Sequence, residues 1–231
     1  MRPDKVKPIY QSCIPSRARE EVVERHPDGS KARCSYYRGP DCVGWRLFEE
    51  SGICTLEVPL AGGKQHGVIY SWFESGALEA AEPWANGLAH GVASQWDESG
   101  FLVGTYDMVN GTGLDLWWHR RFERPGYFLA EARYMVGGRR TGYEWWLNED
   151  GRSVHEETHW LLDAAHGVHR QWCGGGALVE GFPKFFVHGA EVERAAYEKH
   201  AAQDPTLPRY RRAEDQPSRE FPEAVRHWLR Q

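Results

Sequence analysis

The stretch that decides the fold is Gly67-Val-Ile-Tyr-Ser-Trp72-Phe73-Glu-Ser-Gly76-Ala-Leu78, which is followed by Asn86-Gly87-Leu-Ala-His90-Gly91. Apolar and polar residues alternate after Gly67, which is the pattern of a half-buried strand. Glu-Ser-Gly76 and Asn86-Gly87 are turn sequences, because glycine accepts the positive φ that tight hairpin turns require. The stretch therefore predicts a β-hairpin and a second tight turn that leads into the next hairpin.

The same pattern recurs along the chain, because a glycine opens each of six units at intervals of 23, 24, 22, 29 and 25 residues. The opening glycines are Gly44, Gly67, Gly91, Gly113, Gly142 and Gly167. The longest interval contains Arg124-Pro125-Gly126, which predicts an enlarged hairpin loop between Arg120 and Ala132. Since one hairpin cannot bury its apolar face, the units are expected to stack edge to edge. The sequence thus predicts an all-β fold, an elongated and twisted antiparallel meander of stacked hairpin repeats.

The two faces of this predicted sheet differ in composition. Counted from the opening glycine, positions +1, +3 and +5 are mostly apolar and are expected to form the core, with Trp72, Trp96, Trp118 and Trp172 at +5. The opposite phase is mixed and contains Phe73, Trp117 and Trp146. These three aromatic residues are expected on the second face, where they either form a binding surface or are covered by the tail or the enlarged loop.

The repeat is predicted to span residues 21–189, between an N-terminal extension (1–20) and a C-terminal helix and tail (190–231). Residues 192–202 lack Gly and Pro, which predicts a short helix with Ala196 and Tyr197 on its packed side. Residues 221–229 predict a second short helix that begins near Pro222. The tail is expected to fold back as a cap.

Composition excludes several classes of protein. The formal net charge is −5 and the pI is near 6.1, so no nucleic-acid partner is expected. The first 16 residues lack an apolar leader or a membrane-spanning run. The five cysteines include no Cys-x-x-Cys pair, which favours reduced thiols over a disulfide framework. We therefore expect a soluble cytoplasmic protein.

The residues quoted at the start resemble the MORN repeat in its bacterial variant form, and the resemblance covers about Gly29 to Gly189. Repeats of that family are β-hairpins stacked into an elongated sheet. Its members are generally binding or scaffolding modules, and some are proposed to be antitoxins. The resemblance therefore implies a protein-interaction or scaffold module that is antitoxin-like or immunity-like. A repeat describes the scaffold, whereas the surface carried on it determines the role.

Candidate sites are few. His66, His90 and His166 each precede an opening glycine, and equivalent positions in successive hairpins lie about 10 Å apart, which is too far for one zinc ion. We interpret them as turn histidines bonded to backbone, and predict neither a metal site nor a cofactor. Acidic residues beside the turns are expected to be solvated: Glu49, Glu50, Glu74, Glu98 and Glu149. Because no catalytic motif occurs, we predict no enzymatic activity, catalytic residue or small-molecule substrate.

The candidate partner-binding residues are the aromatic residues of the second phase and two basic pairs: Phe73, Trp117, Trp146, Arg120, Arg121, Arg139 and Arg140. A protein partner is the leading hypothesis. Binding of acidic lipid at a membrane surface through the arginines is the first alternative, and solvated charge is the structural explanation for them. An enzyme with a site built from loops is the second alternative.

Overall fold

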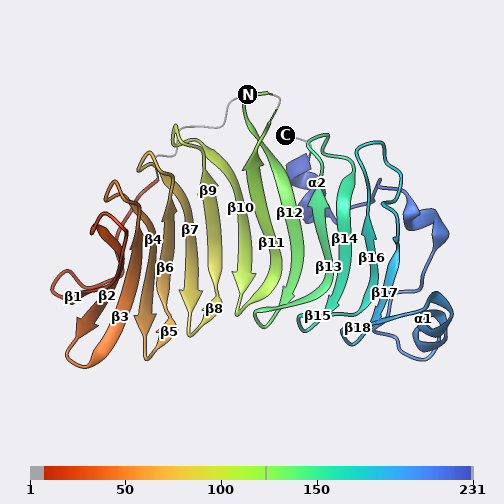
Figure 1. Ribbon diagram of the computed structural model, residues 1–231, viewed down its shortest axis with the longest axis horizontal. Helices are drawn as coiled ribbons and strands as arrows, with labels where there is room; N and C mark the ends of the chain where they lie inside the picture. The colour runs from red at the N-terminus through yellow and green to blue at the C-terminus, as the bar shows by residue number, and fades with distance from the viewer. Residues whose placement is uncertain (1–7, 123, 230–231) are drawn as a thin grey trace. The chain divides into compact units, whose positions relative to one another are not determined.

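The computed structural model describes residues 8–122 and 124–229, and these form an antiparallel β-structure with short helices near the C-terminus. The chain divides into two compact units, unit 1 up to Asn110 and unit 2 from Gly111. Within each unit, successive strands lie side by side in chain order (Figure 1). The predicted all-β meander of hairpins with a small helical tail is therefore confirmed.

Unit 1 is an antiparallel meander of ten strands, in which β5 and β6 both pair with β4 and β8 and β9 both pair with β7. The strands are β1 (Arg19–Arg25), β2 (Lys31–Arg38), β3 (Asp41–Phe48), β4 (Cys54–Ala61), β5 (Lys64–Gln65), β6 (Gly67–Trp72), β7 (Leu78–Ala85), β8 (Leu88–Ala89), β9 (Gly91–Trp96) and β10 (Leu102–Val109). The short strands β5 and β8 continue into β6 and β9 after an interruption at His66 and His90.

Unit 2 continues the same design and adds the helical elements. Its strands are β11 (Thr112–Arg120), β12 (Tyr127–Val136), β13 (Arg139–Leu147), β14 (Val154–Leu161), β15 (Ala164–Ala165), β16 (Gly167–Gln171), β17 (Lys184–Val187) and β18 (Ala190–Val192). They are followed by α1 (Arg194–Ala201), a 3₁₀ turn (Arg212–Asp215) and α2 (Glu223–Leu229). β12 begins at Tyr127, so the connection after β11 is shorter than the enlarged loop expected between Arg120 and Ala132.

Two kinds of turn join the strands. At the first, a glycine with φ between +64° and +87° donates its amide to the carbonyl three residues earlier, at 2.8–3.1 Å. This geometry is shared by Gly29, Gly52, Gly76, Gly100, Gly151 and Gly176. At the second kind, two successive residues have positive φ, as in Asn86-Gly87 and Gly137-Gly138. Leu162-Asp163 makes the same turn without glycine, which the sequence did not predict.

The opening glycines have a packing role. Gly67 has φ +114°, and a Cβ there would lie 2.9 Å from Cys13 Cβ. Gly142 has φ +100°, and a Cβ would lie 3.3 Å from Tyr134 Cβ on the neighbouring strand. The backbone conformation disfavours a side chain at both positions, and at Gly67 a Cβ would also force Cys13 to shift, so the glycine there lets the N-terminal segment pack against the strand.

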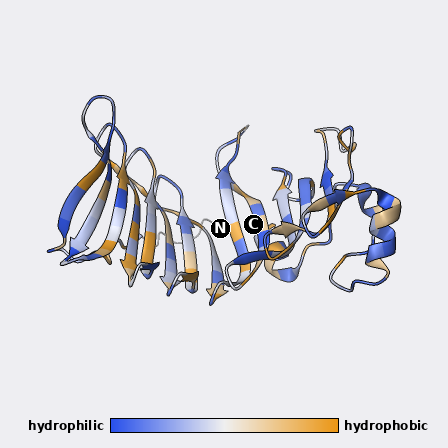
Figure 2. Ribbon diagram, turned by 60° about the horizontal axis from the view of Figure 1, so that its bottom comes forward, coloured by the Kyte–Doolittle hydropathy of each residue, from blue (hydrophilic) through white to orange (hydrophobic). Residues whose placement is uncertain are grey.

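Hydrophilic and hydrophobic residues alternate along many of the strands (Figure 2), and successive side chains of a strand point to opposite faces. Trp96, Trp118 and Trp172 of the predicted core phase are buried, and Trp72 is half-buried. In unit 1 the buried face lies under residues 8–18, where Ile14 packs with Cys34 and Tyr36. In unit 2 it lies under the tail, where Phe221 contacts Trp145 and Trp228 contacts Trp118.

The helices of the tail lie near the predicted positions. Tyr197 of α1 is buried against Phe185 and Val168, and α2 packs against β12. The prediction for Ala196 was wrong, because Ala196 is exposed, whereas Tyr197 and the partly buried Ala201 pack against the sheet. Neither helix in the described residues has the length and apolar character needed to cross a bilayer.

Candidate functional site

Strand register separates the two faces of unit 2. Directly paired residues on neighbouring strands lie on one face of a sheet. One row runs through Leu116, Ala132, Trp145, Glu157 and Arg170, and we call this side the tail face because the C-terminal tail packs on it. The adjacent row on the other side runs through Trp117, Glu131, Trp146, Glu156 and Gln171, and we call this side the tryptophan face.

The tryptophan face combines aromatic rings with a network of charges. Trp117 and Trp146 are both half-buried, and Glu131 pairs directly with each of them. Arg133 Nη2 donates to Glu131 Oε2 at 2.8 Å, and Arg133 Nε lies 3.2 Å from Asp115 Oδ2. The predicted second phase therefore places two of its tryptophans in one row with a carboxylate between them.

The other predicted residues do not join this row. Arg120 is at the end of β11, whereas Arg139 and Arg140 begin β13. Because β11 and β13 run in the same direction, these arginines lie at opposite ends of the strands. Strands of nine residues separate such positions by roughly 25–30 Å. Phe73 belongs to unit 1 and follows β6 in a turn.

Two of the four candidate arginines have structural partners. Arg121 Nη1 donates to the Glu149 carbonyl at 2.6 Å and Nε to the Tyr127 carbonyl at 3.1 Å. Arg140 stacks over the Trp160 ring at 3.7 Å and lies 3.4 Å from Asp163 Oδ1. Arg120 and Arg139 are exposed. The two basic pairs therefore do not form one patch.

One of the turn carboxylates is less solvated than expected. Glu49, Glu50, Glu74 and Glu98 are exposed, but Glu149 is half-buried. Its Oε1 accepts the backbone amide of Phe122 at 2.6 Å, so the side chain holds the enlarged loop. The expectation that turn carboxylates are solvated failed at Glu149, because Phe122 lies beside the turn that contains it and its amide binds the carboxylate.

The tail face carries a buried ionic network around Glu157, which is 2% exposed. Glu157 accepts bonds from Arg170 Nη1 at 2.9 Å, Trp145 Nε1 at 2.8 Å, and Arg219 Nε at 2.6 Å. Arg170 also bonds Asp215 Oδ1 at 3.0 Å. Because a buried carboxylate needs such partners, the network fixes the tail on this face.

Unit 1 has a comparable carboxylate, Glu57, which is 0% exposed. Its Oε1 accepts from Ser12 Oγ at 2.8 Å, and its Oε2 accepts from Tyr10 OH and Arg46 Nε, both at 2.8 Å. Residues 8–18 therefore lie on unit 1 as the tail lies on unit 2. The Tyr10 and Ser12 hydroxyls bind Glu57 from the N-terminal segment, as Arg219 binds Glu157 from the tail.

Surface hollows beside this N-terminal segment contain ionisable groups. One, of about 420 Å³, is lined by Cys13, Tyr36 and Arg46 among others. Burial raises the pKa of Tyr36 to about 12, and the bond to Glu57 holds the pKa of Arg46 above its usual range despite desolvation. Both shifts lead away from neutrality, whereas a general acid or base needs a pKa near the working pH. The arrangement suits packing rather than proton transfer.

The histidines before the opening glycines form hydrogen bonds to the next turn. The Nδ1 atoms of His66, His90 and His166 accept amides of Asn86, Asn110 and His188, at 3.4, 3.1 and 3.0 Å. The prediction of turn histidines bonded to backbone is confirmed. Thr112 and Thr141 occupy the same position and accept the amides of Gly137 and Leu162 through Oγ1.

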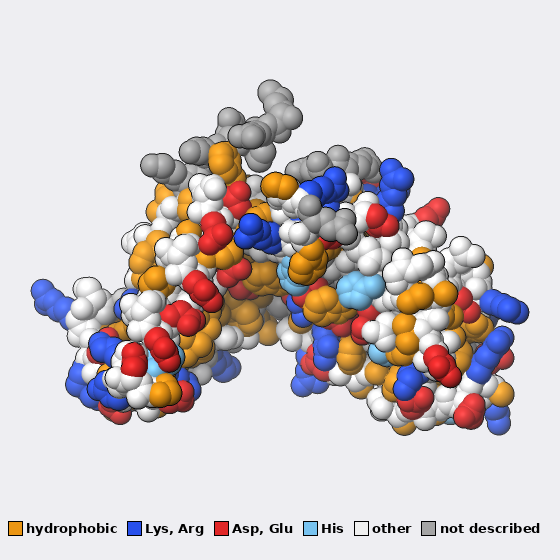
Figure 3. Space-filling model, turned by 45° about the horizontal axis from the view of Figure 1, so that its top comes forward, with side chains coloured by type: hydrophobic (Ala, Val, Ile, Leu, Met, Phe, Trp, Pro, Cys, Tyr) orange, Lys and Arg blue, Asp and Glu red, His pale blue; other side chains and the backbone are white. Residues whose placement is uncertain are grey.

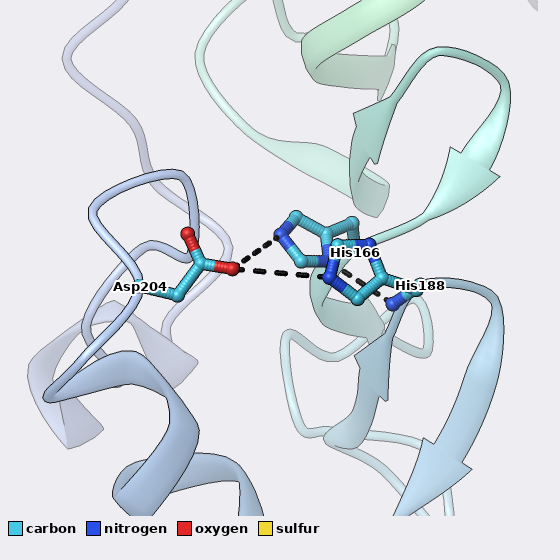
Figure 4. A group of neighbouring side chains, drawn as sticks. All are labelled: His166, His188 and Asp204. Carbon is cyan, nitrogen blue, oxygen red and sulfur yellow. Dashed lines mark hydrogen bonds and ion pairs between the residues drawn. The ribbon is translucent and has the colours of Figure 1, made fainter.

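Within the described residues, His166, His188 and Asp204 form a cluster whose ligand atoms lie within 4.8 Å of one another, close enough to hold a metal ion (Figure 4). The His166 and His188 Nε2 atoms lie 3.6 and 3.9 Å from Asp204 Oδ2. However, His166 Nδ1 accepts the His188 amide, so the neutral ring carries its proton on Nε2. That nitrogen lies 2.9 Å from Thr206 Oγ1, whose hydroxyl donates to Asp204 Oδ1 at 2.6 Å. With Nε2 acting as a donor, the cluster is a hydrogen-bonded attachment of the tail.

Burial also affects this attachment. His166 is fully buried, and desolvation, with the neighbouring His188 second, lowers its pKa. Desolvation likewise lowers the pKa of His159, whose Nδ1 lies 2.6 Å from the His166 carbonyl. The neutral imidazoles are therefore the stable forms at this end of unit 2.

We call the residues that precede the opening glycines and accept an amide of the next turn the turn ladder. Sequence reasoning missed the buried ionic networks and the threonines of this ladder. A signal for the threonines existed, because the residue before the opening glycine is His, His, Thr, Thr and His at positions 66, 90, 112, 141 and 166. No comparable local signal marks Glu57 or Glu157, because important partners are distant in the chain. Ser12 lies 45 residues from Glu57, and Arg219 lies 62 residues from Glu157.

Among protein-family models, curated proteins and solved structures, none matches this chain.

Proposed function

We propose that the protein is a non-enzymatic protein-binding module and that the tryptophan face of unit 2 is its binding surface. The observation that carries this proposal is the placement of two half-buried tryptophans, Trp117 and Trp146, in one row on the side opposite the tail. Large aromatic side chains dominate the energy of many protein interfaces. The resemblance to MORN repeats implies the same general role, including the antitoxin-like or immunity-like form.

The alternative of acidic-lipid binding has weaker support. A lipid surface attracts a cluster of basic side chains on one side of a protein. Here the two pairs of candidate arginines lie at opposite ends of the strands, and Arg121 and Arg140 are engaged in internal contacts. Figure 3 shows acidic and basic side chains interspersed with hydrophobic ones on one face of the described molecule.

Affinity capture tests the proposal, with the full-length chain as bait and its source cells as prey. We expect a specific protein to be recovered by the native chain and lost with the double variant Trp117→Ala/Trp146→Ala. Phe122→Ala is the matched control, because Phe122 is an aromatic residue of the same unit that is 91% exposed and lies outside the row. Circular dichroism establishes that each variant is folded.

Two results would contradict the proposal. One is that no protein is recovered under gentle conditions. The other is that the recovered protein binds the double variant as well as it binds the native chain. Cross-linking followed by mass spectrometry adds a direct readout, since contacts are expected on β11, β12 and β13.

A further inference from the structure

We propose that the tryptophan face binds a basic, extended segment of a partner protein and that a Lys or Arg side chain of this segment lies between Trp117 and Trp146. The inference rests on the proposed function and names the chemistry of the partner. It is carried by the charge of the face, by the geometry around Glu131, and by contacts of the same kind elsewhere in the chain.

Carboxylates outnumber arginines on this face. From β11 to β14 the acidic members are Asp115, Glu131, Glu144 and Glu156, and the basic members are Arg133 and Arg140. Counting these carboxylates and guanidinium groups alone, the group carries a formal charge of −2. A surface of this sign attracts cationic segments and repels acidic ones.

Glu131 lies at the centre of the proposed site. It pairs with Trp117 on one neighbouring strand and with Trp146 on the other, so each indole begins about 5 Å from it. Its Oε2 accepts from Arg133, and its Oε1 lies 3.5 Å from His119 Nε2. Glu131 is 8% exposed, but a carboxylate has about four lone-pair sites, which leaves acceptor capacity for an incoming cation.

The chain itself contains the proposed arrangement. On the same face, Arg140 stacks on Trp160 at 3.7 Å and lies 3.7 Å from Glu144. On the tail face, Arg219 lies 4.9 Å from the centre of the Trp172 ring and bonds Glu157. In both cases an indole and a carboxylate hold one guanidinium. Trp117, Glu131 and Trp146 offer the same groups to a guanidinium from outside.

The row also indicates a spacing for the partner. Glu131 and Glu156 are two strands apart, so their positions are separated by about 10 Å. Three residues of a polyproline II segment advance about 9 Å. A segment in that conformation therefore places basic side chains at i and i+3 over these two carboxylates.

The test uses three labelled nine-residue, proline-rich peptides and measures fluorescence anisotropy with the full-length protein. One peptide has arginine at positions i and i+3, the second has arginine at i and i+1, and the third has glutamate at i and i+3. We expect the first to bind about tenfold more tightly than the glutamate peptide and more tightly than the second. Its affinity should fall as salt rises.

Variants of the protein assign the binding to the site. Glu131→Gln keeps the shape of the side chain and removes its charge, so the arginine peptide should bind about three- to tenfold more weakly. Glu156→Gln is the second variant, at a less buried position, and Trp117→Ala/Trp146→Ala should abolish binding. Glu180→Gln is the matched control, because Glu180 is exposed in the loop between β16 and β17.

The outcomes separate this inference from the proposed function. Equal binding of the arginine and glutamate peptides, or binding unchanged in Glu131→Gln and Glu156→Gln, would overturn the basic-partner inference. If a partner is nevertheless captured from cells and lost with the tryptophan double variant, the proposed function stands with a partner of other chemistry. If neither the peptide nor a cellular protein binds through the tryptophans, both are wrong.

Discussion

Unit 1 places Glu57 on β4 and unit 2 places Glu157 on β14, each buried under the chain segment nearest its own terminus. Glu57 is held by one arginine and by the hydroxyls of Tyr10 and Ser12. Glu157 is held by two arginines and an indole, and one of the arginines, Arg170, also binds acidic residues of the tail. The N-terminal segment is thus attached by neutral donors, whereas the C-terminal tail is attached by ion pairs.

The same hairpin repeat can therefore attach a terminal segment to its sheet in two ways, through neutral hydrogen-bond donors or through ion pairs. Neutral hydroxyl donors satisfy a carboxylate without burying a second charge of the segment. Ion pairs give stronger individual bonds, but each charged group must lose water, so removal of one member leaves the others buried without compensation. Unit 2 should therefore be more sensitive than unit 1 to loss of its central carboxylate.

The largest expected effect follows from Glu157→Gln. The change leaves Arg170, whose side chain is nearly fully buried, and Arg219 without their shared counter-charge. We expect a loss of about 3–5 kcal/mol in the free energy of unfolding of unit 2. Hydrogen exchange read by mass spectrometry should show faster exchange at residues 210–229. Unchanged exchange in that segment would mean that the network does not hold the tail.

A smaller effect is expected from Glu57→Gln. The amide keeps an acceptor for Tyr10 or Ser12, and Arg46 retains contact with solvent and with Tyr36 OH at 3.3 Å. A cost of about 1–3 kcal/mol should therefore appear in unit 1, with faster exchange at residues 10–18. If this variant proves as costly as Glu157→Gln in the same experiment, the contrast between the two attachments is incorrect.

The third prediction concerns pH, because unit 2 buries His166 under the tail while His66 and His90 of unit 1 are exposed. The pKa of His166 is lowered in the folded protein by desolvation, so the unfolded chain binds more protons on acidification. This contribution to stability is complete above the ordinary histidine pKa of about 6.5 and is lost as the pH falls below it. His188, Asp204 and His159 are the other ionisable groups that face this ring.

Exchange at residues 203–208 should therefore become faster between pH 7 and pH 5, after correction for the intrinsic rate. His166→Asn keeps an acceptor near the Nδ1 position for the His188 amide and removes the titrating group. This variant should show a smaller pH response. An equal response in both proteins would assign the effect to other groups.

The smallest effect is expected from the turn ladder. Thr112→Val removes the Oγ1 that accepts the Gly137 amide at 3.0 Å and preserves the shape of the side chain. Because this position is exposed and water can replace the acceptor, the cost should be about 0.5–1 kcal/mol. Chemical denaturation with fluorescence detection measures it. A gain in stability would show that the ladder in unit 2 contributes nothing.

Much of the fold could be predicted because its causes are local. Glycines at regular intervals determine the turns, through the positive φ that Gly76 or Gly87 adopts without a Cβ. Alternation of side chains then assigns Trp118 to one face and Trp117 to the other, since successive residues of a strand point to opposite sides. The sequence by itself therefore determined the hairpins, their order and the faces to which Trp117 and Trp118 belong.

Only the tertiary structure decided which face each terminal segment covers and which charged groups become buried. Glu157 resembles any other strand glutamate in the sequence, and its burial depends on Arg219, which lies 62 residues away. His166 likewise differs from His66 only because Thr206 and Asp204 lie over it. Such contacts join residues that are distant in the chain, so their energy depends on packing and desolvation that no local pattern of residues encodes.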